Sequence, residues 1–326
     1  KILIPDTAHG TNPASVVLNG FEPVPIATGA EGHLLPEAVA PHLGPDLAGI
    51  MVTNPNTLGI YEACLKNIAQ MVHGAGGYVY MDGANFNAIM GKVKPAEIGV
   101  DTMHFNLHKT FSTPHGGGGP GAGPVGMTEE LARFMPLPVI NKEADGSFSL
   151  LTEDNDSMGK LHPFFGNFGV LVRACTYILE LGEEGLHEVT NRAVLNARYL
   201  RHRLEDLLDL PYQVETLHEA VFSDKTLKKE TGISTMDIAK RLLDFGFHPP
   251  TVYFPLIVSG AFMAEPTETE SKEDIDDFVS AVATVISEAR ENPEMVHTAP
   301  HNTGITRLDE AYAARKKILR YTPTQE

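Results

Sequence analysis

The chain has 326 residues, of which 42% are hydrophobic and 21% are charged, and its formal net charge at pH 7 is −17. These values are those of an ordinary globular protein, and the length allows about two domains. The acidic balance argues against a nucleic-acid or anionic-membrane surface, because both need basic patches. The sequence lacks the run of about 18 apolar residues that a membrane-spanning helix needs.

Two cysteines, Cys64 and Cys175, are too few for a disulfide framework or a cysteine-rich metal cluster. So low a cysteine content is typical of a reducing compartment, and the first ten residues lack the architecture of a secretory signal. We therefore expect a cytoplasmic protein. The fourteen histidines show neither an H-E-x-x-H motif nor paired Cys/His spacing, so we expect no metal site.

Short apolar runs alternate with helix-like segments in the first 126 residues. The expected strands are residues 2–4, 24–27, 47–53, 78–81 and 102–107. Between them, residues 36–43 predict a helix with proline in its first turn, and residues 61–72 show apolar positions at helical spacing. Alternation of this kind predicts a doubly wound, mostly parallel sheet that binds ligands at the carboxyl ends of its strands.

Three of the expected strands lead into polar residues that would meet at this edge. Thr53 and Asn54 end one strand, Asp82 ends the next, and Lys109 follows the run at 102–107. The spacing between successive groups is enough for one helical crossover each. For Asp82, the alternative is a helix N-cap, a position at which aspartate is common.

Lys109 precedes a glycine-rich turn. Its six glycines are Gly116, Gly117, Gly118, Gly119, Gly121 and Gly123. Such a turn suits a backbone that lies against a ligand or a partner chain, although a purely structural turn is the alternative. A Walker phosphate loop places its lysine after the glycines, which is the opposite order. A lysine that forms a Schiff base with pyridoxal phosphate fits better, with Asp82 as the carboxylate on the pyridine nitrogen.

The second half of the chain predicts a smaller α/β unit. Prolines and the turn ADGSF (144–148) indicate an irregular connection at 127–165, with a hairpin at 139–151. Further on we expect helices at 169–181, 185–208, 235–245 and 272–288, and strands at 219–223 and 260–264. Ser271 is a suitable N-cap for the last helix, and the residues after Pro293 predict an extended arm. We expect two domains, 1–165 and 166–326.

Five segments resemble the glycine decarboxylase P-protein family of the glycine cleavage system, and more closely subunit 2 of its two-subunit form. They are DTAHGTNPAS (6–15), TNPNTLG (53–59), YMDGANFNA (80–88), HFNLHKTFSTPHGGGGPGAGPVG (104–126) and AEPTETESKEDID (264–276). The resemblance implies a fold type I pyridoxal-phosphate enzyme, with a mostly parallel doubly wound sheet and a smaller C-terminal α/β domain. It also implies that the chain is a C-terminal fragment whose missing part holds the phosphate turn and the ring-stacking residue.

The same resemblance implies roles for individual residues. Lys109 and His108 would be catalytic. The expected cofactor-binding residues are Lys109, Asp82, Ala84, Thr53, Asn54, His108, Thr110 and His9. Ala84 is small enough to lie under a flat ring. The acidic run 265–270 has the composition of a solvated face, whereas the resemblance places it near the mouth of the site.

The family's reaction is the decarboxylation of glycine with transfer of the aminomethyl group to the lipoyl arm of the H-protein. Resemblance therefore implies three partners, namely a homologous subunit 1, the lipoylated H-protein and glycine. One alternative is another fold type I enzyme, either a lyase or an aminotransferase, in which Arg173 or Arg241 would bind a substrate carboxylate. The other is a non-catalytic binding subunit, which would not need Lys109 together with Asp82.

Overall fold

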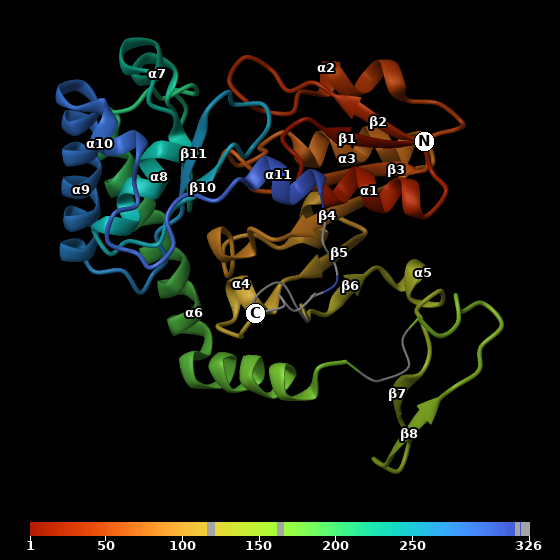
Figure 1. The fold of residues 1–326 in the computed structure, drawn as a ribbon. Coiled ribbons are helices and arrows are strands. Elements are labelled where there is room, and N and C mark those ends of the chain that lie inside the picture. The colour runs from red at the N-terminus through yellow and green to blue at the C-terminus, as the bar shows by residue number, and fades with distance from the viewer. Residues whose placement is uncertain (116–120, 162–165, 317–319, 321–326) are drawn as a thin grey trace.

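The structure is a computed structural model that describes residues 1–115, 121–161, 166–316 and 320. The centre of the protein is a six-stranded sheet (Figure 1). The strand order is β2-β1-β3-β4-β5-β6, and every pair is parallel except β5 with β6. The strands are β1 (Ile2–Pro5), β2 (Pro23–Ile26), β3 (Gly49–Thr53), β4 (Tyr78–Gly83), β5 (Thr102–Phe105) and β6 (Val125–Met127). The doubly wound parallel sheet expected from the sequence is confirmed.

Helices cover this sheet and build the first core. They are α1 (Thr11–Leu18), α2 (Pro36–Val39) and α3 (Leu65–Gly74), with short 3-10 turns at Ala40–His42, Phe86–Ala88 and Pro95–Ile98. The buried face of α3 carries Ile68 and Val72, which pack against Ile50 and Val79 of the sheet. The core residues therefore follow the helical spacing on α3 and the apolar runs in the strands.

Two details of this half differ from expectation. The predicted strand 102–107 is too long, because β5 ends at Phe105 and α4 (Leu107–Thr110) follows as one helical turn. Leu107 and Phe111 are the buried apolar residues that anchor this turn, and the Phe111 N–H donates to the Leu107 carbonyl at 3.0 Å. Helix α1, which includes Asn12, lies in a stretch for which no helix was predicted.

A hairpin and a long helix connect the two halves of the chain. After α5 (Glu129–Ala132), strands β7 (Val139–Lys142) and β8 (Phe148–Leu151) form the predicted antiparallel hairpin, which projects away from the sheet (Figure 1). Helix α6 (Phe168–Leu204) follows and consists of two helical parts that meet at a kink at Gly182, where the backbone is not helical (φ 61°, ψ −170°). The two helices predicted at 169–181 and 185–208 are therefore confirmed, although the second ends at Leu204. The predicted boundary at 165/166 stays a prediction.

The second sheet lies beside the upper end of α6 (Figure 1). Its strands are β9 (Ala220–Ser223), β10 (Thr251–Val252) and β11 (Ala261–Ala264), in the antiparallel order β10-β11-β9. Helix α11 (Glu310–Arg315) comes later in the chain, and the helices packed on this sheet are α7 (Lys225–Thr231), α8 (Thr235–Asp244), α9 (Lys272–Glu291) and α10 (Pro293–His297). They share a second core in which Phe222 of β9 and Phe262 of β11 are fully buried.

The start of α9 confirms the expected cap, and the end of the chain corrects another expectation. The Ser271 hydroxyl accepts from the Asp274 N–H at 3.1 Å, and the Asp274 carboxylate accepts from the Ser271 N–H at 3.1 Å. This reciprocal pair is a capping box. The extended arm predicted after Pro293 is wrong in part, because α10 begins at that proline, where φ is already suited to a first helical turn.

No helix among the described parts of the chain combines the length and the apolar character that a membrane crossing requires.

Candidate active site

Three neighbouring strands bring Thr53, Asp82 and His104 into one row. Thr53 of β3 is the register partner of Asp82 of β4, and Asp82 is the register partner of His104 of β5. Thr53 and Asp82 are each only 4% exposed. Because these strands are parallel, the row lies at a carboxyl edge, where open α/β sheets bind their ligands.

Asp82 is held in this row by two neighbours. Its Oδ1 accepts from the Ala84 N–H at 2.9 Å and lies 3.2 Å from His104 Nε2. Asp82 itself is the fifth residue of the six-residue strand β4, so the helix N-cap interpretation of this aspartate is wrong. Ala84, which we expected under the cofactor ring, is partly buried beside the carboxylate.

The hydrogen bonds of His104 fix which of its nitrogens carries a proton. Nε2 faces two acceptors, Asp82 Oδ1 at 3.2 Å and Asn106 Oδ1 at 3.1 Å, whereas Nδ1 lies 2.6 Å from the Tyr80 hydroxyl. Burial, with a smaller effect of the Asp82 charge, raises the pKa of Tyr80 to about 12. Tyr80 therefore remains a donor to Nδ1, and Nε2 is the N–H that points toward Asp82.

Lys109 extends from α4 into solvent, while the residues around it are fixed. Its side chain is exposed, whereas Leu107 and Phe111 on the same turn are buried against Met90 and the first half of α6. Ser112, directly after this turn, has a φ of 53°. Such left-handed backbone in a residue other than glycine stores strain and is common at functional sites.

Several buried polar atoms near these residues lack a hydrogen-bond partner in the part of the chain that the structure describes. They are Thr53 Oγ1, Asn54 Nδ2, His108 Nδ1, Thr110 Oγ1 and Thr113 Oγ1. Leaving such an atom unpaired costs about 1–3 kcal/mol. In the Asn54 side chain, Nδ2 is unpaired, whereas Oδ1 accepts from the Glu62 N–H at 2.9 Å. Unpaired groups of this kind would be satisfied by a polar ligand.

His108 packs against a second histidine. The ring centroids of His108 and His115 are 4.3 Å apart, with the planes tilted by 58°. Burial lowers the pKa of His108, and the nearby His115 and Lys109 lower it further. A neutral imidazole next to Lys109 can either donate or accept a proton.

Only part of the predicted glycine turn can be placed. Gly116, Gly117, Gly118 and Gly119 lie outside the described residues. A Cβ on Gly123 would lie 1.6 Å from the carbonyl oxygen of Phe105, so the close approach of this segment to β5 requires glycine there. A Cβ on Gly121 would instead meet His108 Cε1 at 3.6 Å, an ordinary contact.

His9 makes local contacts. Its Nδ1 accepts from the Thr11 N–H at 3.1 Å and lies 2.8 Å from the Thr11 hydroxyl, and its ring centroid is 5.4 Å from that of Phe254. The residue is exposed, after the end of β1. These contacts hold the His9 ring between Thr11 and Phe254. The predicted role of His9 in cofactor binding stays a prediction.

Two buried ionisable residues, His218 and Glu219, are absent from the set predicted by the sequence. Their exposed fractions are 0% and 3%, and they immediately precede β9. His218 Nε2 lies 3.6 Å from Glu219 Oε2 and 3.7 Å from Glu265 Oε1. A His-Glu pair directly before an apolar run was the available signal, but the third member follows β11, more than forty residues later in the chain.

The acidic run 265–270 packs onto α6. Asn196 of α6 donates to the carbonyls of Thr267 and Glu270 at 2.9 and 3.0 Å, and the Tyr177 hydroxyl donates to Glu268 at 3.4 Å. Tyr177 also packs against the cluster that anchors α4. The run is therefore in contact with the element that supports Lys109.

The two arginines considered as carboxylate clamps differ in their surroundings. Arg241 forms ion pairs at 2.8 Å with Asp244 and with Glu288, between α8 and α9. Its guanidinium group is therefore already occupied by two carboxylates. Arg173 Nε donates to the carbonyl of Ser112 at 3.0 Å, next to α4.

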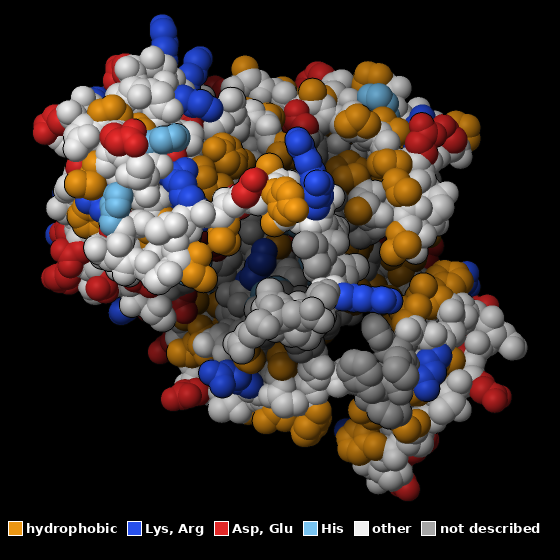
Figure 2. Space-filling model, in the orientation of Figure 1, with side chains coloured by type: hydrophobic (Ala, Val, Ile, Leu, Met, Phe, Trp, Pro, Cys, Tyr) orange, Lys and Arg blue, Asp and Glu red, His pale blue; other side chains and the backbone are white. Residues whose placement is uncertain are grey.

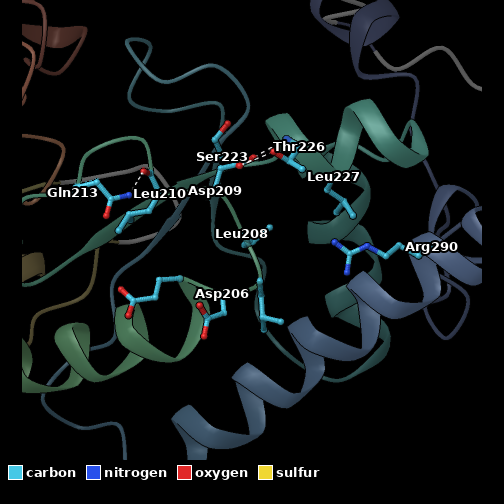
Figure 3. A pocket seen from close by; sticks show the side chains of 11 residues that line it. Asp206, Leu208, Asp209, Leu210, Gln213, Ser223, Thr226, Leu227 and Arg290 are labelled. Carbon is cyan, nitrogen blue, oxygen red and sulfur yellow. Dashed lines mark hydrogen bonds between the residues drawn. The ribbon is translucent and has the colours of Figure 1, made fainter.

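A hollow lies near the middle of the face drawn in Figure 2, with a basic side chain on its floor. The pocket in Figure 3 is elsewhere, has a volume of about 640 Å³ and lies between the end of α6 and α9. Two of its polar residues are already paired with each other, since Asp209 accepts from the Thr226 N–H at 2.6 Å and from its hydroxyl at 2.7 Å. None of the predicted site residues lines it.

A family model and two relatives of this chain carry related names. The family model described as "Glycine dehydrogenase, C-terminal domain" matches residues 189–304. A protein of Oceanobacillus iheyensis, "Probable glycine dehydrogenase (decarboxylating) subunit 2", is 52% identical over 323 residues, which are 99% of this chain and 66% of the relative. A protein of the same name from Shouchella clausii is 51% identical over 100% of this chain and 66% of its own length. The chain thus spans slightly under two thirds of these relatives.

Solved structures agree in fold. A crystal structure of glycine decarboxylase (P-protein) of the glycine cleavage system superposes with a TM-score of 0.70 at 20% identity, covering 87% of this chain and 65% of that chain. A C-DES mutant with glycine covalently linked to its PLP cofactor gives 0.65 at 15% identity, covering 86% and 74%. The fold type I architecture is confirmed, and by its sequence similarity the chain belongs to the family of glycine dehydrogenase (decarboxylating) subunit 2.

Proposed function

We propose that this chain carries the lysine site of a glycine decarboxylase, with pyridoxal phosphate bound covalently through Lys109 Nζ. The observation that carries the proposal is the row Thr53–Asp82–His104 at the carboxyl edge of the sheet, followed directly by the turn that presents Lys109. Support also comes from the relatives' shared name and from the solved structures, one of which holds glycine on PLP.

The residues present fit this cofactor. The unpaired Thr53 Oγ1 and Asn54 Nδ2 could bind the ring hydroxyl, while His108 Nδ1 and Thr110 Oγ1 could bind the phosphate or face the Lys109 nitrogen. Bound there, the cofactor supplies an electron sink for the pair of electrons left when the glycine carboxylate departs as CO2.

Asp82 is the residue that would tune this electron sink. It accepts from the Ala84 N–H and lies beside the His104 N–H, and both interactions orient the carboxylate. An ionised carboxylate would hold a proton on the pyridine nitrogen. His104 therefore acts on the site through Asp82.

The partners follow from the same proposal. The name "subunit 2" implies a partner subunit, which we propose to be a homologous subunit 1. The acceptor of the aminomethyl group would be the lipoyl arm of the H-protein, and glycine would be the substrate. A lyase or an aminotransferase is the second candidate, and Arg173 next to α4 favours it.

An absorbance spectrum tests the attachment point. The full-length subunit with its partner and pyridoxal phosphate should show the band of a lysine-bound cofactor, which shifts on addition of glycine. Lys109→Ala should lack the band, and Lys66→Ala, a surface control on α3, should keep it. Identical spectra for wild type and Lys109→Ala would show that Lys109 is not the attachment point.

Isotope exchange separates the two candidate reactions. Glycine-dependent incorporation of labelled bicarbonate in the presence of the carrier protein is expected only of a decarboxylase. A glycine-shifted spectrum without such exchange would favour the second candidate.

A further inference from the structure

A histidine and two carboxylates meet where strands β9 and β11 of the small sheet lie side by side. His218 and Glu219 immediately precede β9, and Glu265 immediately follows β11. Ala220 of β9 is the register partner of Ala264 of β11 in an antiparallel pair, which brings the two segments together. One nitrogen or oxygen atom of each of the three side chains consequently lies within 4.8 Å of the other two.

Two of these side chains are buried without partners. The exposed fraction is 0% for His218 and 3% for Glu219. Among the residues that the structure describes, neither ring nitrogen of His218 and not the Oε1 of Glu219 forms a hydrogen bond. Each such atom costs about 1–3 kcal/mol, and the second carboxylate, Glu265, adds repulsion between like charges. A cation held by the three side chains would remove both costs.

The distances match the coordination of a small divalent cation. His218 Nε2 lies 3.6 Å from Glu219 Oε2 and 3.7 Å from Glu265 Oε1. Zn²⁺ binds imidazole nitrogen and carboxylate oxygen at about 2.0–2.2 Å, so that tetrahedral geometry places neighbouring ligand atoms about 3.4 Å apart. The octahedral geometry of Mg²⁺ would require about 2.9 Å. The observed separations therefore favour the tetrahedral ion.

The types of side chain also suit Zn²⁺. Burial lowers the pKa of His218, so its ring is neutral and has a lone pair available to a cation. Burial raises the pKa of Glu219, and the charge of Glu265 raises it further. Glu219 therefore holds a proton until a cation displaces it, because carboxyl groups bind metals in the deprotonated form. One imidazole and two carboxylates are all ligand types found in zinc sites.

The cluster is in contact with the loop that follows β3 at the candidate active site. The Leu217 N–H donates to the Gly59 carbonyl at 2.7 Å, and a Cβ on Gly59 (φ +78°) would lie 2.5 Å from the Glu219 carbonyl oxygen. Gly59 belongs to the same loop as the site residue Asn54. An ion that fixes Glu219 would therefore also hold this loop in place.

We propose that His218, Glu219 and Glu265 bind one Zn²⁺ ion that links the ends of β9 and β11. Three protein ligands leave the fourth tetrahedral position to water, and Glu265, whose side chain is 44% exposed, connects the site to solvent. Motif spacing does not reveal this site, because its third ligand follows a different strand, more than forty residues after the first two.

Calorimetric titration with Zn²⁺ tests the site. The protein is the full-length subunit in complex with its partner, without an affinity tag and treated with chelator beforehand. Wild type should bind one more Zn²⁺ per subunit than Glu265→Gln, a variant that keeps the size of a partly exposed side chain. We expect its affinity for this ion to fall at least about 100-fold, because loss of a direct ligand should exceed the 10–100-fold cost of losing an outer-shell partner. His218→Ala should lose the same ion.

An exposed His-Glu pair on α6 provides the matched control. His202 Nδ1 lies 2.8 Å from Glu205 Oε1, and the His202 side chain is 79% exposed. His202→Ala should bind Zn²⁺ with the stoichiometry and affinity of wild type. Equal loss in His202→Ala and His218→Ala would assign the binding to surface histidines and overturn the proposal.

Thermal unfolding provides a second readout on wild type alone. An ion bound only by the folded protein raises Tm, and the rise grows with its concentration. We expect a higher Tm in Zn²⁺ than in chelator for wild type and no such difference for Glu265→Gln. The same wild-type Tm under both conditions would overturn the site, and equal competition by Mg²⁺ would overturn its assignment to Zn²⁺. Neither measurement involves glycine or pyridoxal phosphate, so the outcome is independent of the proposed function.

Discussion

Asp82 and His104 lie side by side in neighbouring parallel strands, with Asp82 Oδ1 3.2 Å from the protonated Nε2 of His104. The histidine is oriented by the Tyr80 hydroxyl on its other nitrogen. A chain of contacts of this kind holds a carboxylate in a fixed orientation. Its members can be removed one at a time.

Replacing His104 should lower the activity without unfolding the protein. We expect His104→Ala to reduce turnover by about 10–100-fold, as for other residues that orient a functional group. Tyr80→Phe should have a smaller effect, because Nε2 would still face its two acceptors. Steady-state kinetics and cofactor titration measure both variants, and equal losses would contradict this order of importance.

Replacing Asp82 by asparagine should abolish most of the activity. The amide would keep the size of the side chain but could no longer hold a proton on the pyridine nitrogen. We expect a loss of at least about 100-fold in turnover, with covalent attachment at Lys109 retained in the absorbance spectrum. Wild-type turnover by Asp82→Asn would show that this carboxylate does not face the cofactor.

Gly123 and Gly121 form a matched pair for a stability test. Gly123→Ala would place a methyl group 1.6 Å from the Phe105 carbonyl, whereas Gly121→Ala meets its nearest atom at 3.6 Å. We expect the first variant to lower the free energy of unfolding by about 1–3 kcal/mol, as overpacking does, and the second to change it little. Urea unfolding of the apo chain provides both values; similar values would mean that the segment moves freely away from β5.

Glu62 should make the stability of the chain depend on pH. It accepts from the Leu34 N–H at 2.8 Å and from Asn56 Nδ2 at 2.7 Å, yet burial raises its pKa from 4.5 to about 7. A carboxyl group with a raised pKa in the folded state contributes full stability below pH 4.5. That contribution falls as the pH rises toward about 7, by on the order of 3 kcal/mol.

Comparison with Glu62→Gln isolates this effect. Urea unfolding at about pH 5 and about pH 8, on either side of the raised pKa, should show that the variant loses less stability than wild type as the pH rises, because the amide does not ionise. Leu34 or Asn56 would lose one acceptor at both pH values, which changes the offset between the two proteins but not the slope. Parallel pH profiles would contradict a raised pKa for Glu62.

The parallel sheet could be predicted because each strand is a short apolar run and each run ends in a polar residue. Thr53 and Asp82 then meet by register alone. The turn at 107–110 could not be predicted, since Leu107 is as apolar as a strand residue and its helical conformation depends on burial against α6. For α1, the polar residues Thr11 and Asn12 obscured the helical spacing.

The residues at the ends of β9 and β11 were harder to identify, because only the pairing of these strands brings them together. Glu219 and Glu265 are neighbours only once β9 and β11 pair, and neither segment carries a local motif for this contact. The acidic run 265–270 illustrates the same difficulty, because its composition is that of a solvated surface although it packs on α6. Contacts of this kind are set by tertiary structure.

The bend in α6 has a consequence for coordination between the two halves of the molecule. The first part of the helix packs on the Lys109 turn, and the second part carries Tyr199, whose hydroxyl donates to Asp276 of α9 at 2.6 Å. Gly182 lies between these two helical parts, and its backbone conformation is accessible at low cost only to glycine. A side chain at residue 182 would therefore strain the link between the helical part that contacts the Lys109 turn and the part that contacts α9.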